Sequence, residues 1–191
     1  MFVTEPPLDA PVSAAYAASA AETGHVMNYV HAWAWRQDVT DAFGDARSLL
    51  SGTTSLSPRE IAVINTAGAG SRDDAACAFA WGTRLAAETD ETTAVSVLRG
   101  SITGLDQRGQ ALARWARLVA TDPNATTQAD VDELREAGLD DRAIAEATML
   151  AAFRLAFTAV NDALGVNPDD ELITAAPAEV RAAVTFGRAA P

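Results

Sequence analysis

The sequence is poor in cysteine and histidine, which limits the redox and metal chemistry that it can carry. Its 191 residues include one cysteine, Cys77, and two histidines. A single thiol excludes a disulfide within the chain and any zinc site built from several cysteines. His25 and His31 are six residues apart, a spacing that does not make a metal-binding pair on a helix. We therefore expect neither a metal nor a cofactor.

Long apolar runs and a targeting segment are also missing. No stretch approaches the roughly 20 apolar residues that a transmembrane helix needs, and the N-terminus lacks the basic and apolar segments of a signal peptide. We therefore expect a cytoplasmic protein that does not bind membranes. The formal net charge of −12 would repel phosphate groups and anionic lipid, so a nucleic-acid partner is disfavoured as well.

Runs of β-branched residues are scarce and alanine is abundant, a pattern that predicts an all-α fold. We expect an extended leader and a short helix over residues 1–23, a helical domain over 24–167, and a C-terminal arm over 168–191. The bundle should contain about nine helices. The apolar segment 144–164 is predicted to be its central helix, because it is apolar on nearly every side.

Helix starts give the clearest local signals. Ser57 suits an N-cap and Glu60 completes a capping box three residues later. Thr127 is predicted to cap another helix, and Ser71 is predicted to cap the helix that contains Cys77. Residues 92–98 are interpreted as a short turn.

One sequence pattern occurs twice. The segments Leu56-Ser-Pro-Arg-Glu-Ile-Ala62 and Leu139-Asp-Asp-Arg-Ala-Ile-Ala145 share Leu-x-x-Arg-x-Ile-Ala at the turn into a helix. Two repeated helical units would explain this pattern. Chance similarity between two ordinary helix starts explains it nearly as well.

Four side chains share one flank of the helix predicted over residues 71–88, among them a carboxylate, a thiol and an indole. At steps of three and four residues, Asp74, Cys77, Trp81 and Arg84 fall on the same side. We interpret Cys77 and Asp74 as candidate catalytic residues and Trp81 as a candidate substrate-binding residue. Each residue also has a purely structural interpretation. Cys77 could be a buried, unreactive thiol, Asp74 a capping carboxylate, and Trp81 an indole that fills the core.

Several segments carry a resemblance to a known family. They are Tyr-Val-x-Ala from Tyr29, Leu-Ser-Pro-Arg-Glu from Leu56, Thr127-Gln-x-Asp-Val-x-x-Leu-Arg-x-Ala-Gly-Leu139 and Val160-Asn-Asp-Ala-Leu-Gly165. Residues 24–167 thereby resemble the carboxymuconolactone decarboxylase superfamily, and most closely its alkylhydroperoxidase D-like branch of peroxidase-related proteins. The resemblance implies an all-helical fold that assembles as trimers or hexamers. It also implies a motif Glu-x11-Cys-x2-Cys-x3-His, in which one cysteine attacks the peroxide, the other forms a disulfide, and glutamate and histidine relay the proton.

This chain departs from that motif at three of its four positions. Cys77 occupies the second cysteine position, whereas Asp74, Trp81 and Ala62 stand where the first cysteine, the histidine and the glutamate are expected. Aspartate forms no disulfide and an indole carries no proton, so the two-cysteine peroxidase cycle cannot operate. His31 could supply the missing imidazole from a preceding helix.

Three functions therefore stay open. The first is an antioxidant, peroxidase-related activity in which Cys77 alone reduces peroxide and an external thiol restores it. The second is binding of a small apolar molecule beside Trp81 without redox chemistry. The third is a lactone decarboxylase-like reaction with Asp74 as acid or base. We also expect a homo-oligomer (dimer, trimer or hexamer), because the apolar helix surface exceeds what one small bundle can bury.

Overall fold

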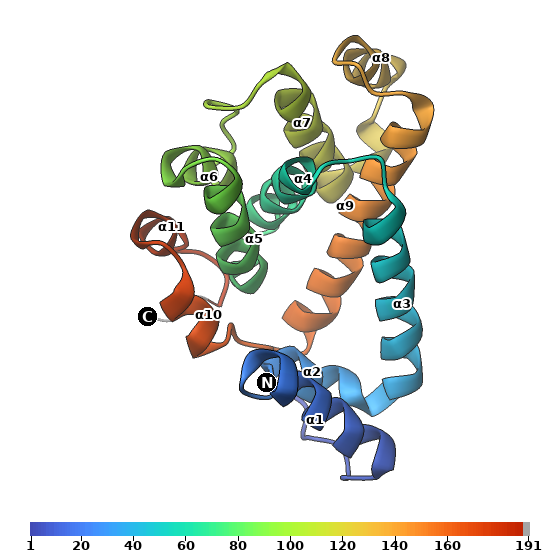
Figure 1. Cartoon of the computed structure of the whole chain (residues 1–191), viewed down its shortest axis with the longest axis vertical. Helices are drawn as coiled ribbons and strands as arrows, with labels where there is room; N and C mark the ends of the chain where they lie inside the picture. The colour runs from blue at the N-terminus through green and yellow to red at the C-terminus, as the bar shows by residue number, and fades with distance from the viewer. Residues whose placement is uncertain (189–191) are drawn as a thin grey trace.

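The computed structural model describes residues 1–188, which form a helical protein without strands (Figure 1). The described helices are α1 (Ala10–Thr23), α2 (Asn28–Trp33), η1 (Ala34–Arg36), α3 (Gln37–Thr53), α4 (Pro58–Ser71), α5 (Ala75–Glu88), α6 (Glu91–Leu98), α7 (Gln107–Thr121), η2 (Pro123–Ala125), α8 (Gln128–Glu136), α9 (Asp141–Ala163), α10 (Asp170–Ala175) and α11 (Ala178–Ala183). The predicted all-α class is confirmed.

Helix α4 forms the centre of the bundle. All its residues from Ala62 to Ala69 are buried, and it packs against α5, α6, α7 and α9. Its small side chains let neighbours approach closely: a Cβ atom on Gly70 would lie 2.2 Å from the carbonyl oxygen of Leu98. The prediction that 144–164 is the central helix is wrong. Helix α9 packs through one face, and Met149 on its other side is 52% exposed.

The start of α4 follows the sequence signals. The Ser57 hydroxyl accepts the Glu60 N–H, and the Glu60 carboxylate accepts the Ser57 N–H at 2.7 Å, which completes the predicted capping box. The same box closes the start of α8 with Thr127 and Asp130. These caps form from residues three apart in the chain, so local sequence is enough to predict them.

Two local predictions are wrong in the segment that follows. Ser71 does not cap α5; it ends α4, and its hydroxyl donates back to the Ala67 carbonyl oxygen at 2.6 Å. Asp74 is the actual N-cap, since its carboxylate accepts the Cys77 N–H. The predicted turn at 92–98 is helix α6, which Asp90 caps in the same way.

The two copies of the Leu-x-x-Arg-x-Ile-Ala pattern occupy equivalent local positions. Leu56 and Leu139 are both buried, and each precedes a capped helix, α4 behind Ser57 and α9 behind Asp140. Duplication of a helical unit stays a prediction.

The sequence predicts no segment apolar enough to span a membrane, but helix α9 passes that test. By length and composition alone it could cross a membrane, and 44% of the residues in its most apolar window are buried within the protein. It carries the buried Arg154 and Glu146 on the face that packs against the bundle. Helix α9 therefore packs against the bundle along one face.

Helix α2 and the loop before α10 lie near the ends of α5 and α9 (Figure 1). The backbone N–H of Asn28, at the start of α2, donates to Asp169 at 2.7 Å in the loop before α10. Helix α10 packs against α5, and α11 packs against α6 and α5. These contacts fix the walls of the cavity described below.

Candidate functional site

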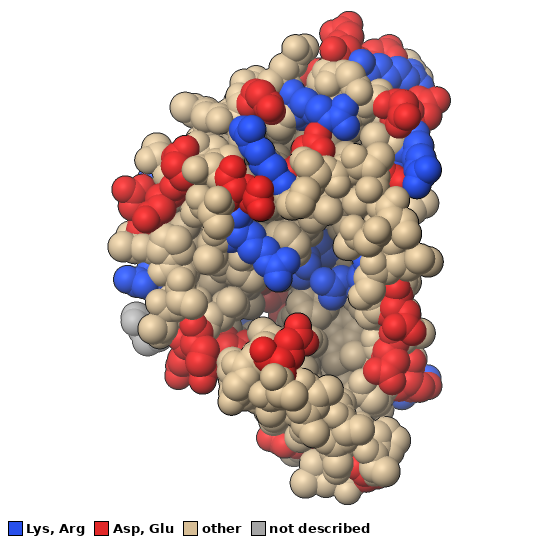
Figure 2. All heavy atoms as spheres, in the orientation of Figure 1, with Lys and Arg blue, Asp and Glu red and all other residues tan. Residues whose placement is uncertain are grey.

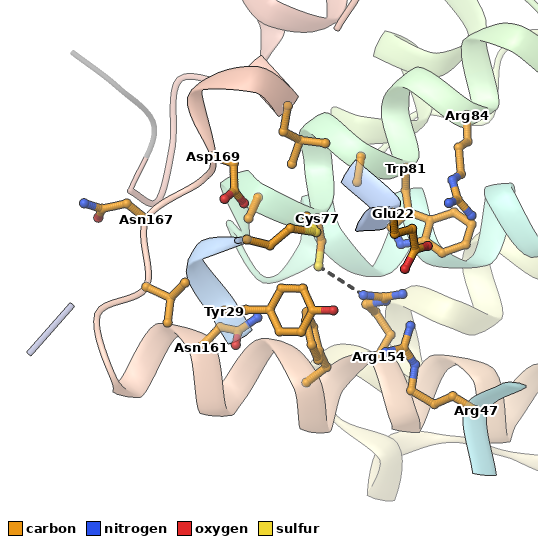
Figure 3. A pocket seen from close by; sticks show the side chains of 16 residues that line it. Glu22, Tyr29, Arg47, Cys77, Trp81, Arg84, Arg154, Asn161, Asn167 and Asp169 are labelled. Carbon is orange, nitrogen blue, oxygen red and sulfur yellow. Dashed lines mark hydrogen bonds between the residues drawn. The ribbon is translucent and has the colours of Figure 1, made fainter. Parts of the chain in front are cut away.

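A cavity of about 290 Å³ lies between α5, α9 and the N-terminal helices (Figure 3). Its wall combines a thiol, aromatic rings and guanidinium groups. These side chains are Cys77, Tyr29, Trp81, Phe157, Arg47, Arg84 and Arg154. The predicted site residues Cys77 and Trp81 therefore meet in one cavity, together with residues of α2, α3 and α9.

Cys77 lies in the first turn of α5 and is 3% exposed. Its Sγ accepts a hydrogen bond from Arg154 Nη1 at 3.4 Å, drawn as a dashed line in Figure 3. The Thr158 hydroxyl contacts the same sulfur at 4.0 Å. Burial raises the pKa of the Cys77 thiol to about 12; Arg154 lowers it and Asp74 raises it further. The thiol is therefore protonated at neutral pH.

Asp74 belongs to the helix start and not to the cavity wall. One carboxylate oxygen accepts the Cys77 N–H at 2.9 Å and the other accepts the Thr158 hydroxyl at 2.5 Å. Burial and the nearby Asp74 raise the pKa of Asp162 to about 6. Asp74 therefore caps α5 beside Cys77, and of the three predicted site residues only Cys77 and Trp81 line the cavity. Both oxygens of Asp74 are occupied, which does not favour an acid–base role.

Trp81 forms part of the cavity wall and contacts two cations. The guanidinium carbon of Arg84 lies 4.7 Å from the ring centroid, and that of Arg154 lies 5.1 Å from it. Such contacts stabilise a guanidinium against an indole face. Trp81 also lines an adjoining space of about 120 Å³, so it borders both spaces.

Arg154 is the functional residue that the sequence analysis missed. It is 8% exposed, and its Nε donates to the Asn65 side-chain oxygen at 3.2 Å while Nη1 reaches Cys77. A signal was available, since Arg154 is the only charged residue between positions 147 and 161 of an otherwise apolar helix. A charge within such a run costs desolvation unless it meets polar partners.

The histidines do not reach the thiol. His31 Nδ1 lies 3.3 Å from Glu5 Oε2, and the ring packs edge-on against Tyr16, outside the cavity wall. The hypothesis that His31 replaces the missing imidazole is therefore wrong. His25 lies 3.3 Å from Asp169. Among residues 1–188, no three His, Cys, Asp or Glu side chains form a group that could hold a metal.

No protein-family model and no curated protein sequence matches the chain. Among solved structures it is similar to the alkylhydroperoxidase AhpD core of an uncharacterized peroxidase-related protein from Ralstonia eutropha JMP134. The TM-score is 0.77 at 22% identity, over 90% of this chain and 93% of that one. An uncharacterized peroxidase-related protein from Silicibacter sp. TM1040 gives 0.77 at 21% identity, over 90% and 91%. This chain has the alkylhydroperoxidase D-like fold. The fold implied by the sequence resemblance is confirmed.

The alkylhydroperoxidase D-like fold also occurs in a more distant structure. The debrominase Bmp8 has a TM-score of 0.72 at 12% identity, over 96% of this chain and 97% of that one. A cysteine-to-alanine variant of Bmp8 was solved in complex with 2,3,4-tribromopyrrole, with a TM-score of 0.70 at 14% identity over 96% of each chain. Within the alkylhydroperoxidase D-like fold, the present chain places Arg154 and Thr158 of α9 against its thiol.

Proposed function

We propose that this chain binds a small organic molecule in the cavity beside Cys77 and Trp81. The observation that carries the proposal is an aromatic-walled cavity of about 290 Å³ next to a thiol whose pKa is about 12. Mostly apolar cavities with a few placed polar groups are the usual form of small-molecule sites, and a protonated thiol is a poor nucleophile. The complex of Bmp8 with 2,3,4-tribromopyrrole supports a small aromatic guest in this fold.

A ligand screen tests this proposal. Small aromatic compounds should raise the melting temperature of the wild type, and Trp81→Ala should weaken binding by roughly tenfold or more, because an aromatic wall is lost. Trp35→Ala is the matched control, since Trp35 is 50% exposed and does not line the cavity. Unchanged affinity in Trp81→Ala would overturn the proposal.

Peroxide reduction by Cys77 alone is the second candidate. The contact that favours it is the hydrogen bond from Arg154 Nη1 to Sγ at 3.4 Å, which stabilises a thiolate. The thiolate would attack a peroxide oxygen, the O–O bond would break, and the leaving alkoxide would take up a proton to become an alcohol. Sulfur is thereby oxidised to a sulfenic acid. One external thiol would form a mixed disulfide and release water, and a second would restore Cys77.

Intact mass after hydrogen peroxide and dimedone tests the second candidate. Because Cys77 is the only cysteine, a dimedone adduct identifies its sulfenic acid directly. Cys77→Ser is the control and should take up no dimedone. A folded wild-type protein that forms no adduct would remove lone-cysteine peroxide reduction and leave ligand binding in place.

A further inference from the structure

Three arginines converge on the cavity without a carboxylate partner. Arg47 of α3, Arg84 of α5 and Arg154 of α9 line it, and all three also line the adjoining space. Among residues 1–188, none of them forms an ion pair within 4.0 Å, whereas six other arginines do. Five further arginines also lack an ion pair among these residues, so the distinctive feature of the three is that they line one cavity together.

The cavity brings cations close together and partly out of water: Arg154 is buried, Arg47 is half-buried and Arg84 is exposed. Burial lowers the pKa of Arg47, and the neighbouring cation of Arg154 lowers it further. Both guanidinium groups also face the Phe157 ring, at 5.2 Å and 5.3 Å from its centroid. Aromatic faces hold guanidinium groups in fixed orientations and leave the N–H groups at their edges free to donate.

The proposed function and this cluster together identify the ligand class. We propose that the cavity binds a single-ring aromatic monocarboxylate, with its carboxylate among Arg47, Arg84 and Arg154 and its ring against Trp81. Guanidinium groups bind carboxylates through pairs of parallel hydrogen bonds. A cavity of roughly 150 Å³ suffices for benzene in other proteins, so about 290 Å³ accommodates one ring and its carboxylate.

The opposite end of the cavity limits the ligand to one negative charge. Asp169 lines the cavity at the side away from the arginines (Figure 3). Its carboxylate already accepts the Asn28 N–H at 2.7 Å and would repel a second anionic group. Glu22 of α1 also lines the cavity and is exposed; its carboxylate would repel an anionic ligand.

Calorimetry with benzoate, benzamide and terephthalate tests this assignment. Benzoate should bind at least about tenfold more tightly than its neutral counterpart benzamide, because charge-assisted hydrogen bonds form only with the anion. Arg84→Met and Arg47→Met should each weaken benzoate binding by about tenfold and leave benzamide binding unchanged. Glu22→Gln should strengthen benzoate binding. Arg135→Met, in the exposed ion pairs of α8, is the control for net charge, and circular dichroism verifies that each variant folds.

The binding results distinguish the preference for an aromatic carboxylate from small-molecule binding in general. Equal affinity for benzoate and benzamide, with Trp81→Ala weakening both, would overturn the anion assignment and support small-molecule binding. Terephthalate binding as tightly as benzoate would overturn the restriction to one charge. If none of the three compounds binds to the folded wild type, the ligand class is wrong, and the wider screen decides the proposed function.

Discussion

Cys77 is a much weaker acid than an exposed cysteine. Burial raises its pKa from 9.0 to about 12, so the thiolate fraction at pH 8 is roughly a thousandfold lower. We expect iodoacetamide to alkylate the native protein about a thousandfold more slowly than free cysteine, as followed by intact mass. Arg154→Met should slow the reaction further, because it removes the cation that favours the thiolate. A native rate within tenfold of free cysteine would contradict this prediction.

The sequence predicts the part of the site that one helix supplies. Cys77 and Trp81 share a cavity because residues four apart lie on one helix face. Asp74 stands at the N-cap, where its carboxylate accepts the Cys77 N–H, so it lies beside Cys77 but outside the cavity wall. Arg47 and Arg154 come from helices distant in sequence, and only tertiary packing brings them to Cys77.

Alanine substitutions at two glycines of α4 test how closely this helix is packed. A Cβ on Gly68 would meet nothing within 4 Å, whereas a Cβ on Gly70 would lie 2.2 Å from the Leu98 carbonyl oxygen. Gly68→Ala should therefore stabilise the protein by about 0.5–1 kcal/mol, and Gly70→Ala should destabilise it by about 1–3 kcal/mol. Urea unfolding measures both, and equal shifts would contradict the packing described for α4.

Glu146 connects the loop before α4 to α9. Its carboxylate accepts hydrogen bonds from Thr54, Ser55 and Arg142, at 2.8–2.9 Å. The hydrogen bond from Arg142, followed by those from Ser55 and Thr54, lowers its pKa from 4.5 to about 2. Because the folded pKa is lowered, this stabilisation is present above about pH 4.5 and is lost as the pH falls through 2.

Glu146→Gln should lower the free energy of unfolding by about 1–3 kcal/mol at pH 7. It should also flatten the dependence of stability on pH between 2 and 4.5. Glu136→Gln is the control, since Glu136 is exposed and ends α8. If both variants show the same pH dependence as the wild type, Glu146 does not stabilise the fold in this way.

The start of a helix can be predicted from the sequence where residues of that helix and its N-cap form the capping hydrogen bonds. Ser57 and Thr127 cap as predicted. Ser71 does not, because α4 continues through it and its hydroxyl bonds within that helix. The central place of α4 was not predictable from hydrophobic pattern, since alanine and glycine give a weak apolar signal yet permit the closest packing.

Basic side chains gather beside a hollow on one face of the molecule. Figure 2 shows them along the upper edge of the hollow, with acidic side chains below it and elsewhere on the same face. All 14 basic residues are arginines, against 26 acidic residues. An acidic exterior with cations gathered at a hollow attracts small anions and disfavours anionic macromolecules.

We propose that the chain forms a homo-oligomer in the cytoplasm. Large apolar side chains are exposed on two long helices, including Leu49 of α3 at 68% and Met149 of α9 at 52%. Leu49→Glu and Met149→Glu should reduce the mass measured by light scattering, because a buried interface does not tolerate the new charge. Asp45→Glu on α3 is the control. A monomeric wild type would contradict the prediction.

The indole of Trp81, whose ring centroid lies 4.7 Å from the guanidinium carbon of Arg84 and 5.1 Å from that of Arg154, gives the protein an intrinsic optical reporter. Tryptophan emission depends on the polarity and charge next to the ring. A guest that draws these cations toward itself changes the ultraviolet fluorescence, so occupancy becomes visible without a dye or label.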